Sequence, residues 1–392
     1  MSPGRARRAG STRRYAVVAG GGTGGHVLPA LAVARALVAR GHPATAIELV
    51  GSRRGQESVL LADEAFPRTL LGGRGIVRSG DVRSTARNLV ALGGAAGAMV
   101  RALVLLGRWR PEVVVSVGGY ASFPAGMAAV VRRVPLVLVN VDAVPGLVHR
   151  LLGPFAAASA VAFPGTALRR AVLTGAPVRA EIEALDRSPA AAAAARAALG
   201  IPGRRQVVAA VGGSLGARRI NEAVVDLARR WHGRGDLALY HVTGRRDWGR
   251  VAAAGLDTRE AEGRLFYRPV PYEEHMGRLL EAADLIVARA GAMTVAELGV
   301  VGVPAVLVPL PQAPGGHQRE NARPLEAAGA AIVVADEECE GGRLAEVIDP
   351  LIGDATRLEA MGTAGRLAGR PGAADRTAEL VEACAAGRAR GA

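Results

Sequence analysis

The chain contains no lysine and few aromatic residues. All 49 basic residues are arginine, aromatic residues make up 3% of the sequence, and the formal net charge is +14. A basic excess favours partners that carry phosphate, which a guanidinium binds through two parallel hydrogen bonds. A compositional bias towards arginine and alanine explains the total equally well. We expect no nucleic-acid partner, because aromatics are scarce and no nucleic-acid-binding motif occurs.

Cysteines, metal-binding motifs and long apolar runs are also scarce. Cys339 and Cys384 stand in no CxxC or Cys/His spacing, which argues against a zinc site or a disulfide framework. No Asp-x-Asp pair and no P-loop motif occur, so we predict no metal and no cofactor. No apolar run reaches the ~18 residues of a membrane span. Residues 1–14 form an expected disordered basic tail without the apolar stretch of a signal peptide, so we expect a cytoplasmic protein.

Short apolar runs alternate with helical patterns along the chain. Half of the 392 residues are hydrophobic, and the length suggests two domains at ~100–200 residues each. Strands that alternate with helices are typical of an α/β fold with a parallel sheet. In the first half we expect strands at 15–19, 45–50, 113–117, 136–139 and 160–163, and helices at 27–40, 83–107 and 123–132.

The alternation starts again near residue 188. Ser188 and Pro189 predict the N-cap and first residue of an alanine-rich helix that ends at Gly200. We place the join between the two arrays near 165–190 and expect two C-terminal helices, at 354–369 and 374–387. The other elements expected in this half are strands at 206–211, 238–242, 285–288, 305–309 and 331–334, and helices at 217–232, 274–283, 294–301 and 318–328.

A glycine-rich loop follows the first expected strand of each array. In Gly20–Gly25 the glycines satisfy G-x-G-x-x-G, and Glu48 ends the second strand, which completes a dinucleotide-binding fingerprint; a plain tight turn is the alternative. His26 lies in the first helical turn, where the helix dipole favours a neutral imidazole that can act as a base or bind phosphate. In Gly212–Gly216, Ser214 suits a phosphate or an ordinary N-cap.

Two later segments carry polar side chains beside expected strand ends. Thr294 and Glu297 have the spacing of a capping box, in which Glu297 would bond its own helix end. The other interpretation gives Glu297 the vicinal hydroxyls of a ribose, and spacing alone does not decide between them. In the loop 311–321, Gln318 and Asn321 offer amides suited to sugar hydroxyls, although a solvated loop and helix cap explain them as well.

Taken together, these segments resemble one family. The chain is similar to the undecaprenyldiphospho-muramoylpentapeptide β-N-acetylglucosaminyltransferases, which form lipid II for peptidoglycan. The resemblance extends over residues 15–335. The stretches that carry it are GGGTGGHVLPALAVARAL (20–37), VGGYASFPAGMAA (117–129), TGAPVR (174–179), VGGSLGARRIN (211–221), RAGAMTVAELGVVGVPAVLVPLP (289–311) and HQRENARPLEAAGAA (317–331).

The resemblance implies two Rossmann-like parallel-sheet domains that face a cleft, the GT-B architecture. Residues 15–178 would bind the acceptor and face the membrane, residues 179–371 would bind the UDP-sugar, and the helix at 374–387 would pack back on the first domain. The implied reaction moves N-acetylglucosamine from UDP-N-acetylglucosamine to the 4-hydroxyl of undecaprenyl-diphosphate-linked N-acetylmuramyl pentapeptide. Transfer would invert the anomeric centre and need no metal, with helix N-termini stabilising the departing diphosphate.

The family's site residues carry over by motif. Ser214 and the loop around Thr294 would hold the diphosphate, Glu297 the ribose and Gln318 the acetylglucosamine. Arg179 would contact the nucleotide, and His26 would meet the acceptor and the incoming sugar. The expected donor-binding set is Thr23, Gly24, Gly25, Asp142, Arg179, Ser214, Glu273, Ala292, Met293, Thr294, Val295, Ala296, Glu297 and Gln318, with His26 and Asp142 as candidate bases.

The chain departs from the family pattern in two segments. The family usually reads His-Glu-Gln-Asn before Ala-Val-Pro-Gly, whereas this chain reads Val-Asn-Val-Asp at 139–142. Asp142 thus replaces an asparagine that contacts the donor sugar, and it can accept a hydrogen bond but cannot donate one. His317 stands where the family often has glutamine. Donor preference is therefore open, and Asp142 is either a sugar contact or a base.

The acceptor of this family is lipid-linked, which implies a peripheral protein on the cytoplasmic face of the cell membrane. Residues 71–78 mix apolar and basic side chains and, with the helix at 83–107, suit an anionic lipid surface; an ordinary loop over the core is the alternative. Three other functions stay open: a related transferase for another UDP-sugar or lipid acceptor, a non-catalytic homologue, and a nicotinamide-dependent oxidoreductase, which would leave the second glycine loop without a role.

Overall fold

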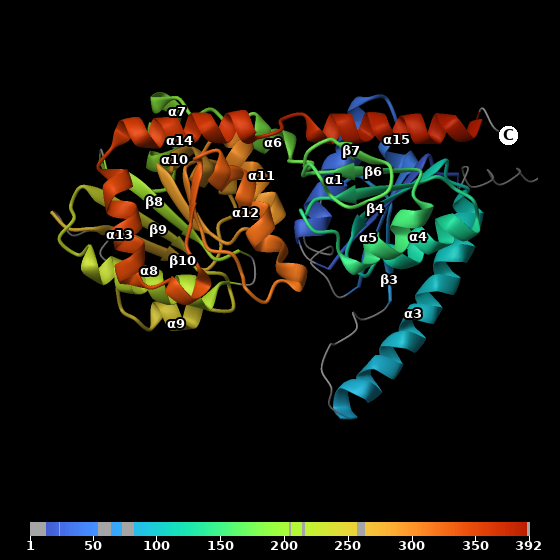
Figure 1. The fold of residues 1–392 in the computed structure, drawn as a ribbon, viewed down its shortest axis with the longest axis horizontal. Helices are drawn as coiled ribbons and strands as arrows, with labels where there is room; N and C mark the ends of the chain where they lie inside the picture. The colour runs from blue at the N-terminus through green and yellow to red at the C-terminus, as the bar shows by residue number, and fades with distance from the viewer. Residues whose placement is uncertain are drawn as a thin grey trace, which may run out of the picture.

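The protein folds into two lobes, each built on a parallel sheet (Figure 1). A computed structural model describes residues 13–22, 24–53, 64–72, 82–203, 205–213, 216–256 and 263–389. The first sheet has seven strands in the order β3-β2-β1-β4-β5-β6-β7, and the second has six in the order β10-β9-β8-β11-β12-β13. All recorded strand pairs are parallel. The two-array α/β prediction is confirmed.

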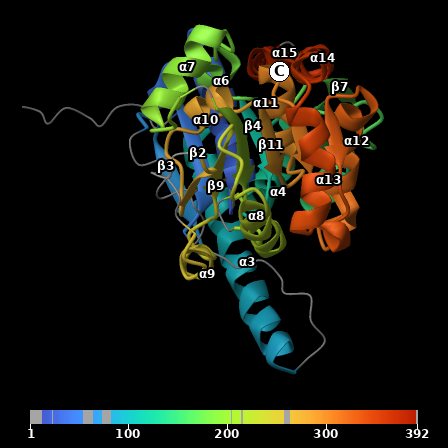
Figure 2. The ribbon, with the colours of Figure 1, turned by 90° about the vertical axis from the view of Figure 1, so that its left-hand side faces the viewer.

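The N-terminal sheet is buried between two helical layers because its central strands are almost wholly apolar. β1, β4 and β5 are buried at every residue. The elements of this domain are β1 (Ala16–Gly20), α1 (Gly24–Ala39), β2 (Ile47–Ser52), β3 (Arg68–Leu71), α3 (Val82–Trp109), β4 (Val113–Gly118), α4 (Ser122–Val131), β5 (Leu136–Asn140), α5 (Leu147–Leu152), β6 (Ala158–Val161) and β7 (Ala171–Leu173). Figure 2 shows α3 extending away from both lobes.

The C-terminal domain repeats the plan with shorter strands. Its elements are α6 (Ala180–Glu183), α7 (Pro189–Ala198), β8 (Gln206–Val211), α8 (Arg218–Arg230), β9 (Leu237–Val242), α9 (Trp248–Ala252), β10 (Phe266–Val270), α10 (Met276–Ala282), β11 (Leu285–Ala288), α11 (Ala292–Val301), β12 (Ala305–Leu307), α12 (His317–Ala327), β13 (Ala331–Val333), α13 (Gly341–Ile352), α14 (Ala355–Ala368) and α15 (Ala373–Ala389). Four 3-10 turns complete the assignment, η1 (Ala44–Ala46), η2 (Gly153–Phe155), η3 (Pro314–Gly316) and η4 (Asp336–Glu338).

The predicted cap of the alanine-rich helix is present. Ser188 Oγ accepts a hydrogen bond from the backbone N–H of Ala191, and Pro189 is the first residue of α7. Sequence patterning missed β3, β7 and β10. β7 is apolar in sequence but only three residues long, Ala171–Leu173, which is too short a run to mark a strand, and β10 contains Arg268 and Pro269, which read as a loop.

The chain crosses between the lobes twice. After the second crossing, α15 packs against α1 and strands β4 to β6 of the N-terminal domain, and Figure 1 shows α14 and α15 running along one side of both lobes. Arg40 forms ion pairs of 2.9 Å with Asp375 and Glu382. The two crossing segments also touch, because a Cβ on Gly175 would lie 2.8 Å from Cβ of Arg370. We call residues 174–183 and 369–372 the hinge.

Two features of the N-terminal domain correct the sequence interpretation. Arg14 lies outside any disordered tail, since its N–H donates to Trp109 O and its Nε lies 2.9 Å from Glu48 Oε2. Glu48 begins β2 instead of ending it, is 3% exposed, and also accepts from Thr69 Oγ1 at 2.8 Å. It is a structural ion-pair partner at the amino end of the sheet, so its proposed part in a dinucleotide fingerprint is wrong.

Candidate functional site

The first glycine loop lies against a second glycine turn that the sequence analysis gave no role. Gly22 has a φ of +105°, which only glycine adopts readily. Gly119, just after β4, packs so closely that a Cβ there would lie 2.1 Å from Gly21 O. The signal was present in the sequence, because Gly118 and Gly119 follow an apolar strand. Gly24 is half-buried and Gly25 exposed, while Thr23 lies outside the described residues.

His26 lies on top of this glycine pair. A Cβ on Gly118 would come within 2.9 Å of His26 Cδ2 and 3.5 Å of His149 Cε1, so the two imidazoles flank the same backbone position. His26 is half-buried on the first turn of α1, as expected, and it acts electrostatically on both His149 and Asp142. The carboxyl ends of β1, β4 and β5 therefore bring His26, His149 and Asp142 together.

His149 and Asn140 form a buried network behind these groups. His149 Nε2 lies 3.1 Å from Ser116 O and Nδ1 lies 3.0 Å from Asn140 Oδ1. Asn140 Nδ2 donates to the Asp142 carbonyl at 2.6 Å. Burial lowers the pKa of His149 to about 4, so the imidazole is neutral at pH 7. The network fixes the backbone that carries Asp142.

The second glycine loop has the same construction. A Cβ on Gly244, after β9, would lie 2.4 Å from Gly216 N and 3.0 Å from Gly213 O. Gly212 N–H donates to Val242 O, and α8 begins at Arg218 with no side-chain cap on its Ala217 N-cap. Ser214 lies outside the described residues, so its expected phosphate contact stays a prediction.

The N-terminus of α11 has the geometry of an anion site. The helix begins at Ala292, and its N-cap Gly291 makes no side-chain capping bond. The N–H groups of Ala292, Met293 and Thr294 have no partner within the helix, and the dipole adds partial positive charge. Thr294 is the third residue of the helix and is not its cap, so the capping-box interpretation of Thr294 and Glu297 is wrong.

Glu297 instead lies beside Arg179 from the hinge. Arg179 Nη2 is 3.8 Å from Glu297 Oε1, and Nη1 is 3.7 Å from Glu181 Oε1. Burial raises the pKa of Glu297, and Arg179 partly offsets that shift. Arg179 Nε is buried with no hydrogen-bond partner among the described residues. A largely buried carboxylate and an incompletely satisfied guanidinium therefore lie together, one and a half turns from the α11 N-terminus.

Asp142 spans the domain boundary. Its Oδ1 lies 2.9 Å from His317 Nδ1 and accepts a second hydrogen bond, also 2.9 Å long, from Asn321 Nδ2. His317 is the first residue of α12, and Asn321 lies one turn further along the helix. The hydrogen bonds and the charge of His317 lower the pKa of Asp142 against the opposing effect of burial, and Asp142 raises the pKa of His317. Asp142 and His317, one from each segment that departs from the expected family pattern, thus contact each other.

Gln318 and Glu273 have part of their polar groups already engaged. Gln318 Oε1 accepts from Leu310 N–H at 2.9 Å, so its amide NH₂ is the group that remains to bind a ligand. Glu273 accepts from Tyr240 Oη at 2.6 Å and from His275 N–H at 2.8 Å. Its carboxylate holds the loop after β10 through these two hydrogen bonds, and its expected part in donor binding stays a prediction.

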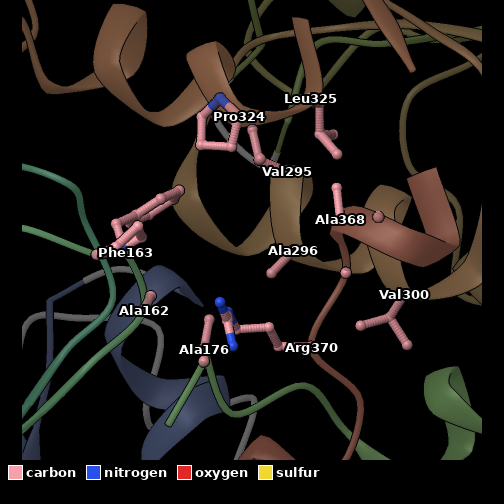
Figure 3. Close-up of a pocket in the computed structure, with 14 residues that line it drawn as sticks. Ala162, Phe163, Ala176, Val295, Ala296, Val300, Pro324, Leu325, Ala368 and Arg370 are labelled. Atoms are coloured by element: carbon pink, nitrogen blue, oxygen red, sulfur yellow. The ribbon is translucent and has the colours of Figure 1, made fainter. Parts of the chain in front are cut away.

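An apolar pocket of about 230 Å³ lies between the domains, behind α11. Figure 3 shows Phe163 on one side, Pro324 and Leu325 of α12 on another, and Arg370 of the hinge at the bottom. Val295 and Ala296, expected at the donor site, line this pocket. Its lining suits apolar atoms and not a diphosphate.

Two parallel-sheet domains that bring their strand carboxyl ends together, each with a glycine loop before a helix, define a GT-B glycosyltransferase. The models of the glycosyltransferase family 28 N-terminal and C-terminal domains match residues 16–161 and 207–377. The chain belongs to this family, and specifically to its branch of UDP-N-acetylglucosamine–N-acetylmuramyl-(pentapeptide) pyrophosphoryl-undecaprenol N-acetylglucosamine transferases.

Relatives match along nearly the whole chain. The transferase of that name from Desulforudis audaxviator is 37% identical over 375 residues, 93% of this chain and 97% of the relative. The one from Frankia casuarinae is 39% identical over 381 residues, 96% of this chain and 97% of the relative. The crystal structure of Acinetobacter baumannii MurG superimposes with a TM-score of 0.71 at 27% identity, covering 94% of this chain and 99% of that one.

Proposed function

We propose that the protein transfers N-acetylglucosamine from UDP-N-acetylglucosamine to the 4-hydroxyl of undecaprenyl-diphosphate-linked N-acetylmuramyl pentapeptide. The proposal rests on the match to UDP-N-acetylglucosamine–N-acetylmuramyl-(pentapeptide) pyrophosphoryl-undecaprenol N-acetylglucosamine transferases. The match extends through both domains, so it includes the donor-binding half and the acceptor-binding half. In this proposal residues 15–178 bind the acceptor, and residues 179–371 bind the donor.

The donor contacts follow the polar groups around α11. The uncapped N–H groups of α11 and Arg179 hold the diphosphate, together with Ser214 and the N-terminus of α8. The carboxylate of Glu297 accepts from the ribose hydroxyls, which gives this largely buried group close hydrogen-bond partners. The free amide NH₂ of Gln318 donates to the sugar. The backbone around Glu273 reads the uracil.

Transfer is proposed as one inverting displacement. The acceptor oxygen forms a bond to the anomeric carbon as the bond from that carbon to UDP breaks, and the hydroxyl proton moves to a base. His26 fits this role better than Asp142. The Asp142 oxygen that faces α12 already accepts two hydrogen bonds, and a carboxylate with a lowered pKa is a weak proton acceptor near neutral pH. Helix N-termini and Arg179 stabilise the negative charge that develops on the departing UDP, so no metal is required.

The acceptor requires contact with a membrane. None of the helices in the described part of the chain combines the length and apolarity that crossing a bilayer demands. We therefore propose peripheral binding to an anionic leaflet on the cytoplasmic side. Residues 73–81, most of the apolar-basic segment expected to dock, lie outside the described residues, so that assignment stays a prediction. Sedimentation with anionic and neutral vesicles at low and high salt tests it, and equal binding to both vesicles contradicts it.

The decisive experiment supplies labelled UDP-N-acetylglucosamine with a short-chain lipid-linked muramyl pentapeptide. We expect a disaccharide product, and no product when the acceptor lacks its 4-hydroxyl. Binding of the donor without transfer would instead support a non-catalytic homologue.

Asp142 is the observation that favours a second candidate, a transferase for a different UDP-sugar, because it replaces an amide at a sugar contact. Competing UDP-N-acetylgalactosamine and UDP-glucose in the same assay measures donor preference, and a higher kcat/KM for either would select the second candidate.

A further inference from the structure

The contact between Asp142 and His317 joins the two domains at a place well removed from the hinge. Asp142 follows β5 of the N-terminal domain, and His317 begins α12 of the C-terminal domain. Val144 is adjacent to the same region, since a Cβ on Gly315 would lie 3.6 Å from its Cγ1. The residues after β5 therefore lie against the start of α12.

Asn321 makes the contact specific. Its Oδ1 accepts from Ala143 N–H at 2.8 Å, and its Nδ2 is shared between Asp142 Oδ1 at 2.9 Å and Ala290 O at 3.3 Å. Asn321 is fully buried. Because this amide bonds both domains at once, any opening at this place breaks hydrogen bonds of Asp142 and Ala143 together.

The interdomain pocket lies between this contact and the hinge. Pro324 and Leu325, one turn beyond Asn321, line one side, and Gly369 and Arg370 of the hinge line another. The cavity, of about 230 Å³, leaves part of the domain boundary unpacked. The Asp142 contact therefore adds a specific polar link to a boundary that packing alone does not close.

We propose that Asp142 and His317 form an interdomain clasp that sets domain closure, and through closure the affinity for the donor. The pair replaces two amides of the family pattern with an acid and a base that function as one unit. The effect on donor affinity rests on the proposed function, whereas the effect on closure does not. Asp142 and His317 are positioning residues in this proposal, and His26 remains the base.

A clasp made of an acid and a base depends on pH. The titratable groups that act on Asp142 are His317 from α12 and His26 from α1, and His149 from α5 responds to both His26 and Asp142. Asp142 raises the pKa of His317 above its usual value of 6.5, and the pKa of Asp142 is lowered below 3.8. Between these two pKa values Asp142 is ionised and His317 is protonated, so both members of the pair are charged. It weakens as pH rises through the raised pKa of His317, because a neutral imidazole still donates from Nδ1 but without charge.

Closure can be measured without any substrate. Cysteines are introduced at the exposed positions 101 on α3 and 222 on α8 in a Cys339→Ala/Cys384→Ala background. Dyes attached to these two cysteines report the interdomain distance by energy transfer. We expect the closed population to fall as pH rises from 6 to 9, and the Asp142→Asn/His317→Gln variant, which restores the amide pair, to show no such change. A matching pH response in both proteins would overturn the clasp.

A double-mutant cycle tests whether the two residues act as a unit. UDP-N-acetylglucosamine affinity is measured by calorimetry for Asp142→Ala, His317→Ala and the double variant. Loss of a charge-assisted hydrogen bond predicts roughly a tenfold weakening in each single variant, and the double variant should be no weaker. Losses that multiply to roughly a hundredfold would overturn the pairing. If Asp142→Ala does not fold, Asp142→Asn takes its place in the cycle.

The control is Glu326→Gln, which removes an exposed ion pair with Arg319 on the same helix and should change neither closure nor affinity. The two proposals fail separately. A protein that closes with the expected pH dependence but transfers no sugar refutes the proposed function alone, whereas an active transferase whose closure ignores Asp142 refutes the clasp alone.

Discussion

The two domains share one arrangement of glycine loops and buried polar residues, and they differ in the side chains at their facing edges. Each sheet has a glycine loop wedged against a second glycine turn, Gly119 on Gly21 and Gly244 on Gly216. Behind each loop a buried histidine bonds an asparagine that donates to a loop carbonyl. In the N-terminal domain this is His149 with Asn140, and in the C-terminal domain it is His241 with Asn221, whose Nδ2 donates to Thr243 O at 2.9 Å.

The domains differ at their facing edges. The N-terminal edge carries His26 and Asp142, groups that handle protons or charge. The C-terminal edge carries an uncapped helix N-terminus, Glu297 and Gln318, groups that bind. The shared scaffold therefore holds loops rigidly in both halves, and the chemistry comes from a few side chains that differ between them. Mutations in the scaffold should act on folding, those of His26 on kcat, and those at the second edge or in the Asp142 clasp on donor affinity.

The largest expected effect is on the scaffold at acid pH. Burial lowers the pKa of His149 to about 4 and of His241 to about 3. The unfolded chain, with a histidine pKa of about 6.5, therefore binds more protons between these values, so stability falls as pH drops below about 6.5. Near pH 4 each histidine should cost roughly 3 kcal/mol.

Thermal melting from pH 7 to 4 measures this cost. His149→Asn and His241→Asn should each flatten the decline, whereas His232→Asn, at an exposed histidine, should not. Unequal slopes for the first two variants would break the symmetry between the domains.

The next largest effect is expected at the N-terminal edge. His26→Ala should lower kcat by ~100-fold or more with little change in donor KM, within the range for loss of a general base. Asp142→Asn should leave kcat within about tenfold of wild type, because an amide still accepts both hydrogen bonds from α12. Steady-state transfer kinetics for both variants decide the assignment, and a severe loss in Asp142→Asn with a mild one in His26→Ala would reverse it.

A smaller and different effect is expected at the C-terminal edge. Glu297→Ala should raise donor KM by roughly 10–100-fold, the equivalent of ~1.5–3 kcal/mol in charge-assisted hydrogen bonds. Its melting temperature should change little, since Glu297 does not cap its helix and its partner Arg179 is 3.8 Å away. Kinetics and melting of the same preparation test this. A fall in melting temperature with unchanged KM would make Glu297 structural.

The smallest effect is expected from metal removal. The groups proposed to hold the diphosphate are helix N-termini and Arg179, and the sequence has no Asp-x-Asp pair. Exhaustive EDTA treatment should therefore leave the transfer rate unchanged. Activity that disappears with EDTA and returns with magnesium or manganese would contradict metal-free transfer.

Much of the fold could be predicted from the sequence, because its central strands are apolar runs that end in glycine. β11 lies at 285–288 as expected, and α1, α4 and α8 differ from prediction by a few residues at their ends. β3 and β7 were missed because they are edge strands of four and three residues, too short for an apolar run or an alternation to mark them. Glu48 was misread because spacing does not reveal which end of a strand a residue occupies.

The candidate site likewise contains residues that the sequence predicts and residues that only the structure identifies. The glycine loops, His26, Glu297 and Gln318 could be selected from sequence, because motifs at strand ends and helix starts are local. Asn140 and His149 could not, since each is an ordinary polar residue until the fold supplies its partner. Asn321 was selected as an amide for a sugar hydroxyl, but its side chain instead bonds Asp142, Ala143 and Ala290. The choice between a capping box and a ligand-binding role for Glu297 also required the observed start of α11 at Ala292.

The sequence by itself determined the two parallel α/β domains, the glycine loops and the family, because apolar periodicity and local motifs act over a few neighbouring residues. Only the tertiary structure decided that Asp142 and His317, 175 positions apart, touch across the domain boundary. Their contact depends on how two independently folding sheets are oriented by the hinge, α14 and α15. Such a long-range contact results from the packing of the whole chain, and no periodicity of the sequence marks the residues that it brings together.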